Sequence, residues 1–327
     1  MRCVVSAIGD CMKKWLVLLL AFFLMSPVLA QAWSPEKEVT LLVAYKAGSG
    51  TDTGARLLAK YARNYAGQTL VITNLPGGDG KIGWTKLAQS KPDGYTIGFI
   101  NLPSFTTLAT QTNASFSVES VIPIANHLTE TCVVVVKADS PWKTLQELVQ
   151  ACQEKKNLRC STNGNKASNH TAAQLLASSA KFSYKAIPYG GTADQLLALR
   201  QGEVQFSCAK VADIAPLTQG DSKELRVLGV FAKQRLPEYP DAPTLGELGY
   251  YPEWYGSARA LVAPKGTPKE ILDFYEDAFN KAMHDPECIT AHKNANLNLD
   301  YKDSKELAEL IHAQLVFCRD SIAKLYQ

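Results

Sequence analysis

The sequence predicts an α/β fold made of two domains. Three observations favour it: a chain of 327 residues of which 46% are hydrophobic, short apolar runs that alternate with helical patterns, and glycine-rich loops between them. At about 150 residues per domain, this length suggests two domains. The formal net charge is only +3, so the chain lacks the basic excess of a nucleic-acid-binding protein, and no nucleic-acid partner is expected.

A first series of strands and helices begins at Val39. The continuous apolar run VTLLVAY predicts a strand over Val39–Tyr45, and apolar residues at helical spacing predict a helix that begins near Thr51. The same alternation predicts a strand over Thr69–Asn74, a helix over Ile82–Gln89, a strand over Tyr95–Ile100 and a buried strand over Cys132–Val136. Strands that alternate with helices predict a parallel sheet with right-handed crossovers.

A second series of the same kind predicts the second domain. It contains the strands LRCST, YKAIPY, VQFSC and LRVLGVF, with helices predicted over Asn169–Ser179 and Thr192–Gln201. From Pro268 onward the pattern is mainly helical, and long amphipathic helices are predicted over Lys269–His284 and Ser304–Tyr326.

Residues 1–32 are predicted to be a cleaved secretory signal peptide. From Met12 they read MKKWLVLLLAFFLMSPVLAQA, which is two lysines, an apolar run from Trp15 to Met25 and small residues before the cleavage point. The apolar run is shorter than the roughly 20 residues that a membrane-spanning helix needs. We therefore expect a mature protein outside the cytoplasm, with translation that starts at either Met1 or Met12.

Six cysteines remain after this signal, and an oxidising compartment allows disulfides. They are Cys132, Cys152, Cys160, Cys208, Cys288 and Cys318. The sequence does not determine how they pair. Our hypothesis is two disulfides, Cys152–Cys160 and Cys288–Cys318, because each pair brackets a short connection between predicted elements. No metal site is predicted, since no CxxC pair exists and the five histidines are scattered.

Loops rich in Gly, Ser, Thr and Asn follow the predicted strands. They are Ala47–Asp52, Pro76–Gly80, Asn101–Thr107, Ser161–His170 and Tyr189–Asp194. Ligands of open α/β sheets bind at the carboxyl ends of the strands, and free amides at a helix N-terminus attract anions. The loops therefore predict a site for a carboxylate or a phosphate. Because most of the basic excess lies in the signal, this attraction must come from local amides.

No catalytic set accompanies these loops. The string GSGTDTG has the spacing GxGxxxG instead of GxGxxG, and the second strand ends in Asn74 where a dinucleotide site would need an acidic residue. His170 is the one catalytic candidate, and helix capping or hydrogen bonding to a ligand is its competing interpretation. We predict no catalytic residue and no cofactor. A periplasmic α/β enzyme remains the alternative from another functional class.

Five segments, in order along the chain, carry a recognisable family pattern. They are EVTLLVAYKAGSGTDTGARLLA, VITNLPGGDGKIGWTKLAQSKPDGYTIGF, IPYGGTADQLLALRQGEV, FAKQRLPEYPDAPTLGELGY and WYGSARALVAPKGTP. Together they resemble the Bug family, the periplasmic solute-binding proteins of tripartite tricarboxylate transporters. The strings PDGYT and APKGTP make this resemblance more specific than glycine loops alone.

The resemblance implies a two-domain periplasmic binding protein of the type II-like, Venus-flytrap kind, with a hinge and a ligand cleft between the domains. We expect residues 33–125 to form the first part of domain 1, residues 126–231 to form domain 2, and residues 232–327 to return to domain 1. It also implies a monomer that captures a small organic carboxylate and delivers it to membrane transporter subunits. A sensor receptor in place of the transporter is the alternative partner.

In that family, two turns of the first domain hold a ligand carboxylate through backbone groups and ordered water, and the second domain closes over the rest. Carried onto this chain, the resemblance and the strand-end loops give the predicted ligand-binding residues Tyr45, Lys46, Ala47, Gly48, Ser49, Gly50, Thr51, Asp52, Gly77, Gly78, Asp79, Gly80, Asn101, Ser104, Asn163, Gly164, Asn165, His170, Gly191 and Thr192.

The chain also departs from the family pattern. Lys46 stands where the family usually has proline, and Asp79 and Lys81 replace Gly and Asn in the second turn. Gly190 stands where a lysine is usual, and Ala209-Lys210 where an acidic or amide residue is common. One hypothesis is that Lys46 faces the cleft and recognises a second carboxylate. The alternative is a solvated surface lysine.

Overall fold

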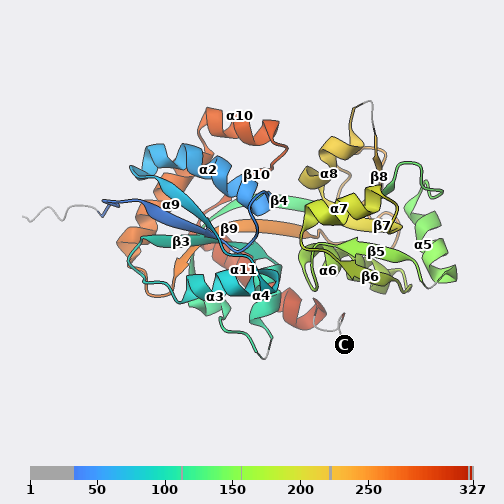
Figure 1. Ribbon diagram of the computed structural model, residues 1–327, viewed down its shortest axis with the longest axis horizontal. Coiled ribbons are helices and arrows are strands. Elements are labelled where there is room, and N and C mark those ends of the chain that lie inside the picture. The colour runs from blue at the N-terminus through green and yellow to red at the C-terminus, as the bar shows by residue number, and fades with distance from the viewer. Residues whose placement is uncertain (1–32, 112, 156, 221–222, 323–324, 326–327) are drawn as a thin grey trace, which may run out of the picture. The chain divides into compact units, whose positions relative to one another are not determined.

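Strands of the chain join into one curled, mixed sheet in this computed structural model (Figure 1). The structure describes residues 33–111, 113–155, 157–220, 223–322 and 325, so the predicted signal peptide lies outside the described residues. The ten strands are β1 (Val39–Val43), β2 (Leu70–Asn74), β3 (Thr96–Leu102), β4 (Val121–Lys137), β5 (Arg159–Thr162), β6 (Lys185–Pro188), β7 (Phe206–Lys210), β8 (Leu225–Val230), β9 (Gly256–Pro264) and β10 (Leu299–Lys302).

The prediction of a parallel sheet is only partly right. The order is β2-β1-β3-β9-β4-β7-β5-β6, and β8 and β10 also pair with β4. β1 runs parallel to β2 and β3, and β5 runs parallel to β6 and β7. Between these two parallel blocks lie β4 and β9, which pair antiparallel with each other and with their other neighbours. The sheet is mixed because these two long strands connect the blocks.

Ten helices of the described residues cover this sheet. They are α2 (Gly50–Ala66), α3 (Lys81–Ala88), α4 (Ser104–Ala109), α5 (Leu145–Glu154), α6 (Ser168–Ser179), α7 (Thr192–Arg200), α8 (Val211–Thr218), α9 (Lys269–Met283), α10 (Pro286–Asn294) and α11 (Ser304–Phe317). Two short 3₁₀ turns, η1 (Gly78–Gly80) and η2 (Val118–Ser120), and a π-helical turn, η3 (Cys318–Ile322), complete the set. The α-helical part of the predicted Ser304–Tyr326 helix ends at Phe317, and the π-helical turn continues it to Ile322. None of the described helices is both long and apolar enough to cross a bilayer.

An apolar core supports each of the two parallel blocks. One packs α3, α4 and α11 against β1, β3 and β9, with the buried rings of Trp84 and Phe105 at its centre. The other packs α5 and α6 against β4, β5 and β7 around Phe206. We call the part with β1–β3 and α2–α4 the first lobe, and the part with β5–β7 and α6–α8 the second lobe. Figure 1 shows β4 and β9 running between them.

The hypothesis of two disulfides is wrong. Each of the six cysteines in the described chain is a free, buried thiol. The Cys318 sulfur lies 3.2 Å from Thr106 Oγ1 of α4, whereas Cys288 lies in α10 on the opposite face of the sheet (Figure 1). Cys152 and Cys160 pack as separate thiols in the second core. Burial raises the pKa of the Cys152 and Cys288 thiols to about 12, which keeps both protonated and unreactive at neutral pH.

Candidate functional site

The first predicted turn, between β1 and α2, is organised by the buried Asp52 carboxylate. Its Oδ2 accepts hydrogen bonds from Gly48 N at 2.8 Å and from Arg56 Nε at 3.0 Å, and its Oδ1 accepts one from Asn74 Nδ2 at 2.9 Å. Burial alone would raise the pKa of Asp52, but these donors outweigh it and lower the pKa below its usual value. The side chain of Asp52 is thus fully used in shaping the turn, in which the amides of Gly48, Ser49 and Asp52 are also engaged. The amides of the turn that can meet a ligand are those of Ala47, Gly50 and Thr51.

The second predicted turn, η1 and the loop before it, lies directly beside the first. Asn74 at the end of β2 donates to the Tyr45 carbonyl at 3.0 Å, which ties the two strand ends together. Gly80 has a φ of 107°, and a Cβ there would lie 2.7 Å from the Trp84 ring. Asp79 also adopts a left-handed φ of 57°. Glycine is therefore required at position 80, and the turn is held close against the first core.

The second lobe approaches both turns. A Cβ added at Gly164 would lie 2.6 Å from Asp79 Oδ1, so the Asn163–His170 loop touches the second turn. A Cβ added at Gly190 would lie 3.6 Å from Lys46 Nζ, so the next loop touches the first turn. Asp79, beside Gly164, is partly buried, and this burial raises the pKa of its carboxyl. The structure thus brings the predicted loops of the two lobes together. Whether the exposed Lys46 contacts a ligand stays a prediction.

Polar side chains of the first lobe lie at the base of the two turns. Asn101 Nδ2 donates to Thr51 Oγ1 at 2.8 Å, which fixes the first turn of α2 to β3. Burial raises the pKa of the Tyr45 phenol well above its usual range, and a hydrogen bond with Ser104 opposes only part of this shift. Tyr45 is therefore a neutral hydrogen-bond donor at neutral pH, which suits an anionic ligand.

The side chain of His170 binds the backbone of the loop that precedes its own helix, α6. Its Nδ1 accepts a hydrogen bond from Lys166 N at 3.0 Å, and Asn163 Oδ1 accepts one from Asn169 N at 3.2 Å. Burial, helped by the Lys166 charge, lowers the pKa of His170 to about 4. The neutral ring and the engaged Nδ1 favour a role in holding the loop before α6 over catalysis for this histidine.

Several buried polar residues near the site were not predicted from the sequence. Lys210 Nζ donates to Ser168 Oγ at 2.7 Å and to Asn169 Oδ1, and Asn169 in turn donates to Gln195 Oε1 at 2.8 Å. This network fixes the start of α6 on β7. The departure at Ala209-Lys210 was the sequence signal that could have found it, because a lysine at the end of an apolar strand needs a polar partner.

Arg259 in β9 was also missed. It is only 5% exposed, and its Nη1 donates to the Gly50 carbonyl in the first turn of α2 at 3.1 Å. Glu130 in β4 is nearby, and burial raises its pKa to about 7 even though the Arg259 charge lowers it. The available signal was an arginine inside the apolar run ARALVAP.

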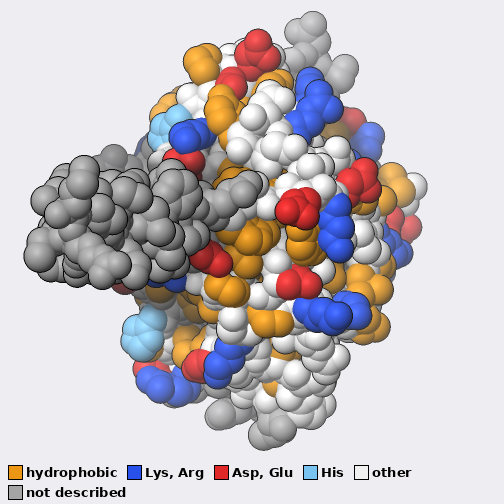
Figure 2. Space-filling view, turned by 90° about the vertical axis from the view of Figure 1, so that its left-hand side faces the viewer, with side chains coloured by type: hydrophobic (Ala, Val, Ile, Leu, Met, Phe, Trp, Pro, Cys, Tyr) orange, Lys and Arg blue, Asp and Glu red, His pale blue; other side chains and the backbone are white. Residues whose placement is uncertain are grey.

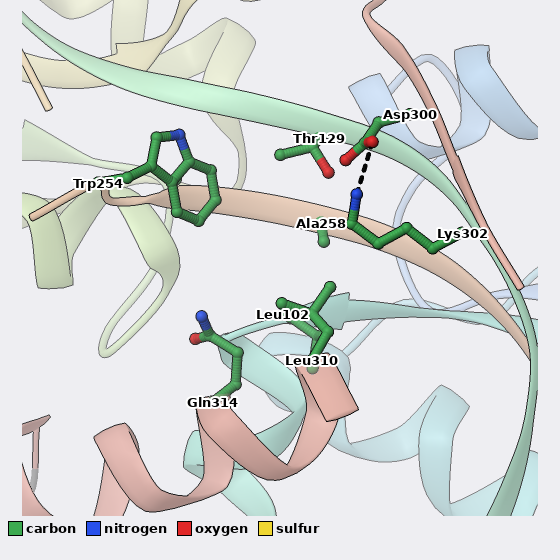
Figure 3. A pocket seen from close by; sticks show the side chains of 9 residues that line it. Leu102, Thr129, Trp254, Ala258, Asp300, Lys302, Leu310 and Gln314 are labelled. Atoms are coloured by element: carbon green, nitrogen blue, oxygen red, sulfur yellow. Dashed lines mark hydrogen bonds and ion pairs between the residues drawn. The ribbon is translucent and has the colours of Figure 1, made fainter. Parts of the chain in front are cut away.

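A cavity of about 220 Å³ lies on the other face of the crossing strands (Figure 3). It is lined by Leu102, Thr129, Trp254, Gly256, Ala258, Asp300, Lys302, Leu310 and Gln314. None of the predicted site residues lines it, because Leu102 and Ala258 alternate along their strands with Asn101 and Arg259 and point to the opposite face. Its charged groups already pair, with Lys302 Nζ 2.6 Å from Asp300 Oδ1. We therefore place the candidate site at the turns and not in this cavity.

Among the described residues, neither a patch of basic side chains on the face in Figure 2 nor a metal site is found to attract an anion, which is consistent with an anion site made by backbone groups. On the face shown in Figure 2, Lys and Arg side chains are interspersed with Asp and Glu, without a patch of one sign. Nowhere in the described part of the chain do three or more His, Cys, Asp or Glu side chains gather as a metal site.

Comparison with known proteins places the chain in a family. The family model described as "Tripartite tricarboxylate transporter family receptor" matches residues 54–325. A curated relative from Cupriavidus necator, "UPF0065 protein in gbd 5'region", is 31% identical over 285 residues, which is 86% of each chain.

Solved structures share the fold. The periplasmic binding protein BugD is 26% identical with a TM-score of 0.81, over 89% of this chain and 98% of that one. MatC from Rhodopseudomonas palustris, solved with bound malate, is 24% identical with a TM-score of 0.79, over 88% and 99%. The periplasmic-binding-protein fold and the family suggested by the five segments are thereby confirmed. This chain belongs to the TctC family, the solute-binding receptors of tripartite tricarboxylate transporters.

Proposed function

We propose that this receptor captures a small carboxylate between its two lobes and delivers it to a tripartite tricarboxylate-type membrane transporter. One observation carries the proposal: two turns at neighbouring strand ends meet the loops of the second lobe at Asp79–Gly164 and Lys46–Gly190. Free amides at both turns suit a carboxylate, and bridging water lets one scaffold accept acids of different shapes. The malate bound to MatC supports this ligand class.

In this proposal the predicted domains move about β4 and β9. Residues 33–125 and 232–327 form one domain, residues 126–231 form the other, and the two crossing strands supply the hinge. A ligand that contacts both domains favours the closed form, so the transporter can distinguish loaded protein from empty protein. The predicted signal, a periplasmic location and a monomeric receptor fit this role. A sensor receptor would use the same closure and is the alternative partner.

The proposed role is binding without chemistry. The Asp52 carboxylate already accepts hydrogen bonds from three donors in and around the first turn, and the neutral His170 ring accepts one from the Lys166 amide. Among the described residues, the Asp52 carboxylate accepts no hydrogen bond from a serine, threonine or cysteine side chain, as an acid-base pair would need. We infer that the ligand leaves unchanged. Incubation of the protein with a bound acid, followed by chromatography, should return only that acid.

A thermal-shift screen of the mature chain against small mono-, di- and tricarboxylates tests the proposed function. A ligand at 100 times its dissociation constant stabilises the folded state by about 2.7 kcal/mol, so at least one acid should raise the melting temperature by several degrees. Amides of the same acids, which lack the charge, serve as controls and should give no shift. If no acid raises the melting temperature, the proposed function is wrong.

A further inference from the structure

The buried guanidinium of Arg259 has no anionic partner in the described chain. Its side chain is 5% exposed, its Nε has no hydrogen-bond partner, and among the residues that the structure describes no carboxylate oxygen lies within 4.0 Å of its nitrogens. The guanidinium donates one hydrogen bond to the described chain, from Nη1 to the Gly50 carbonyl. A guanidinium stays charged in proteins and is costly to bury alone, so such a group normally meets an anion.

Arg259 lies at the proposed carboxylate site. It is the cross-strand neighbour of Asn101, whose amide holds Thr51 in the first turn of α2. A Cβ added at Gly50 would lie 2.8 Å from Arg259 Nη2, so the guanidinium touches the backbone of the first turn. The Arg259 charge also reaches Tyr45, where it lowers the pKa of the phenol against the larger effect of burial.

The unused hydrogen-bonding capacity continues next to Arg259. The Oδ1 atom of Asn101 is buried and has no partner in the structure. Arg259 Nε, a donor, and Asn101 Oδ1, an acceptor, thus both lack a partner beside the first turn. A ligand carboxylate would satisfy Arg259, whereas Asn101 Oδ1 needs a hydrogen-bond donor such as a hydroxyl or a water.

The nearest protein acids do not neutralise Arg259. Burial raises the pKa of Glu130 to about 7, so this carboxyl is substantially protonated at neutral pH. Asp213 at the start of α8 approaches from the second lobe, and its Oδ1 would lie 3.4 Å from a Cβ at Gly50. It remains beyond 4.0 Å from the guanidinium, and an anion that enters with the ligand would fill this place.

We propose that Arg259 is a specificity-determining residue that binds a second ligand carboxylate, so that the receptor takes dicarboxylates. This rests on the proposed function. The first carboxylate is held by the amides of the two turns, and the second meets the planar guanidinium, which matches carboxylate geometry with two parallel hydrogen bonds. Lys46 is exposed, whereas Arg259 is buried beside the first turn, and we assign the selectivity to Arg259.

Calorimetric titration of the mature chain with two matched series tests this. The probes are succinate, glutarate and adipate, and butyrate, valerate and hexanoate as their monocarboxylate counterparts. Arg259→Met should weaken the best dicarboxylate roughly 10- to 100-fold and the monocarboxylates less than about 3-fold. Arg259→Lys should restore part of the selectivity. Arg226→Met, at a β8 arginine that donates to the backbone carbonyls of Trp142 and Ala138, should change neither series. Lys46→Met should leave the difference between the two series in place.

A readout on the unaltered protein keeps the test valid if Arg259→Met does not fold. With ¹⁵N-labelled arginine, the dicarboxylate that binds best should shift the Arg259 Nε–H resonance, and its monocarboxylate should not. If the wild-type chain binds both series equally, or if Lys46→Met alone removes the selectivity, the role of Arg259 is rejected while the proposed function stands. If no probe of either series binds and no carboxylate raises the melting temperature in the thermal-shift screen, the proposed function is rejected, and the role of Arg259 with it.

Discussion

Replacing Asp52 by alanine should lower the free energy of unfolding by about 3 kcal/mol and abolish carboxylate binding. Asp52 is 2% exposed and satisfies Gly48 N, Arg56 Nε and Asn74 Nδ2 at once. Removing a buried acceptor leaves each donor without a partner, and charged hydrogen bonds contribute about 1.5–3 kcal/mol each. Part of the loss is discounted because Arg56 is 52% exposed and can turn to water. Urea denaturation measures the change in stability.

A matched variant separates the turn from a general helix effect. Glu270 is also an acid in the first turn of a helix, α9, but it is exposed and has no recorded hydrogen bond to a turn. Glu270→Ala should change stability by less than about 0.5 kcal/mol and leave binding intact. Equal effects of the two substitutions would show that Asp52 acts only on the helix dipole and does not shape the turn.

Replacing Glu130 by glutamine should stabilise the protein at pH 8 by about 3 kcal/mol and change it little at pH 4.5. Burial, helped by the charge of Asp213, raises the pKa of Glu130 from 4.5 to about 7, against the opposing effects of the Arg259 charge and of the Asn298 and Ala212 amides. The folded state therefore keeps a proton that the unfolded state has lost between these values. Wild-type stability falls as pH rises from about 4.5 to 7, and glutamine, which cannot ionise, removes that loss.

Urea denaturation of both proteins at the two pH values checks this. Glu253→Gln is the control, because Glu253 is an exposed acid paired with Lys233 at 3.0 Å, and it should stay within about 0.5 kcal/mol of wild type at both pH values. A Glu130→Gln variant with the same advantage at pH 4.5 as at pH 8 would mean that ionisation of Glu130 is not the cause.

Elements with local periodicity were predictable, and those that depend on the assembled sheet were not. The strand at Val39–Val43 and the helix from Gly50 carry their own apolar pattern and capping signals. β9 is buried at all nine positions, so it has no alternation to recognise, and β4 spans 17 residues that include Pro123 and Glu130. Helix α8 follows β7 without any loop, since Lys210 is both the last residue of the strand and the N-cap residue of the helix.

The site divides in the same way. The glycine loops were found because strand ends and helix starts are visible in the sequence, and the family pattern named the same loops. Arg259 and Lys210 were missed because the sequence does not show whether a single charged residue in an apolar run is exposed or buried. The disulfide hypothesis failed because spacing along the chain does not set the distance between Cys288 and Cys318 in space.

Amide NMR of the mature chain labelled with ¹⁵N-glycine, titrated with the carboxylate that gives the largest thermal shift, tests the central claim most directly. Glycines of both lobes should shift together, namely Gly48, Gly50, Gly77, Gly78, Gly80, Gly164, Gly190 and Gly191. Gly67 and Gly202, which follow the far ends of α2 and α7, should stay fixed. If Gly256 at the cavity shifts while the turn glycines do not, or if only one lobe responds, the carboxylate is not held between the two turns and the second lobe.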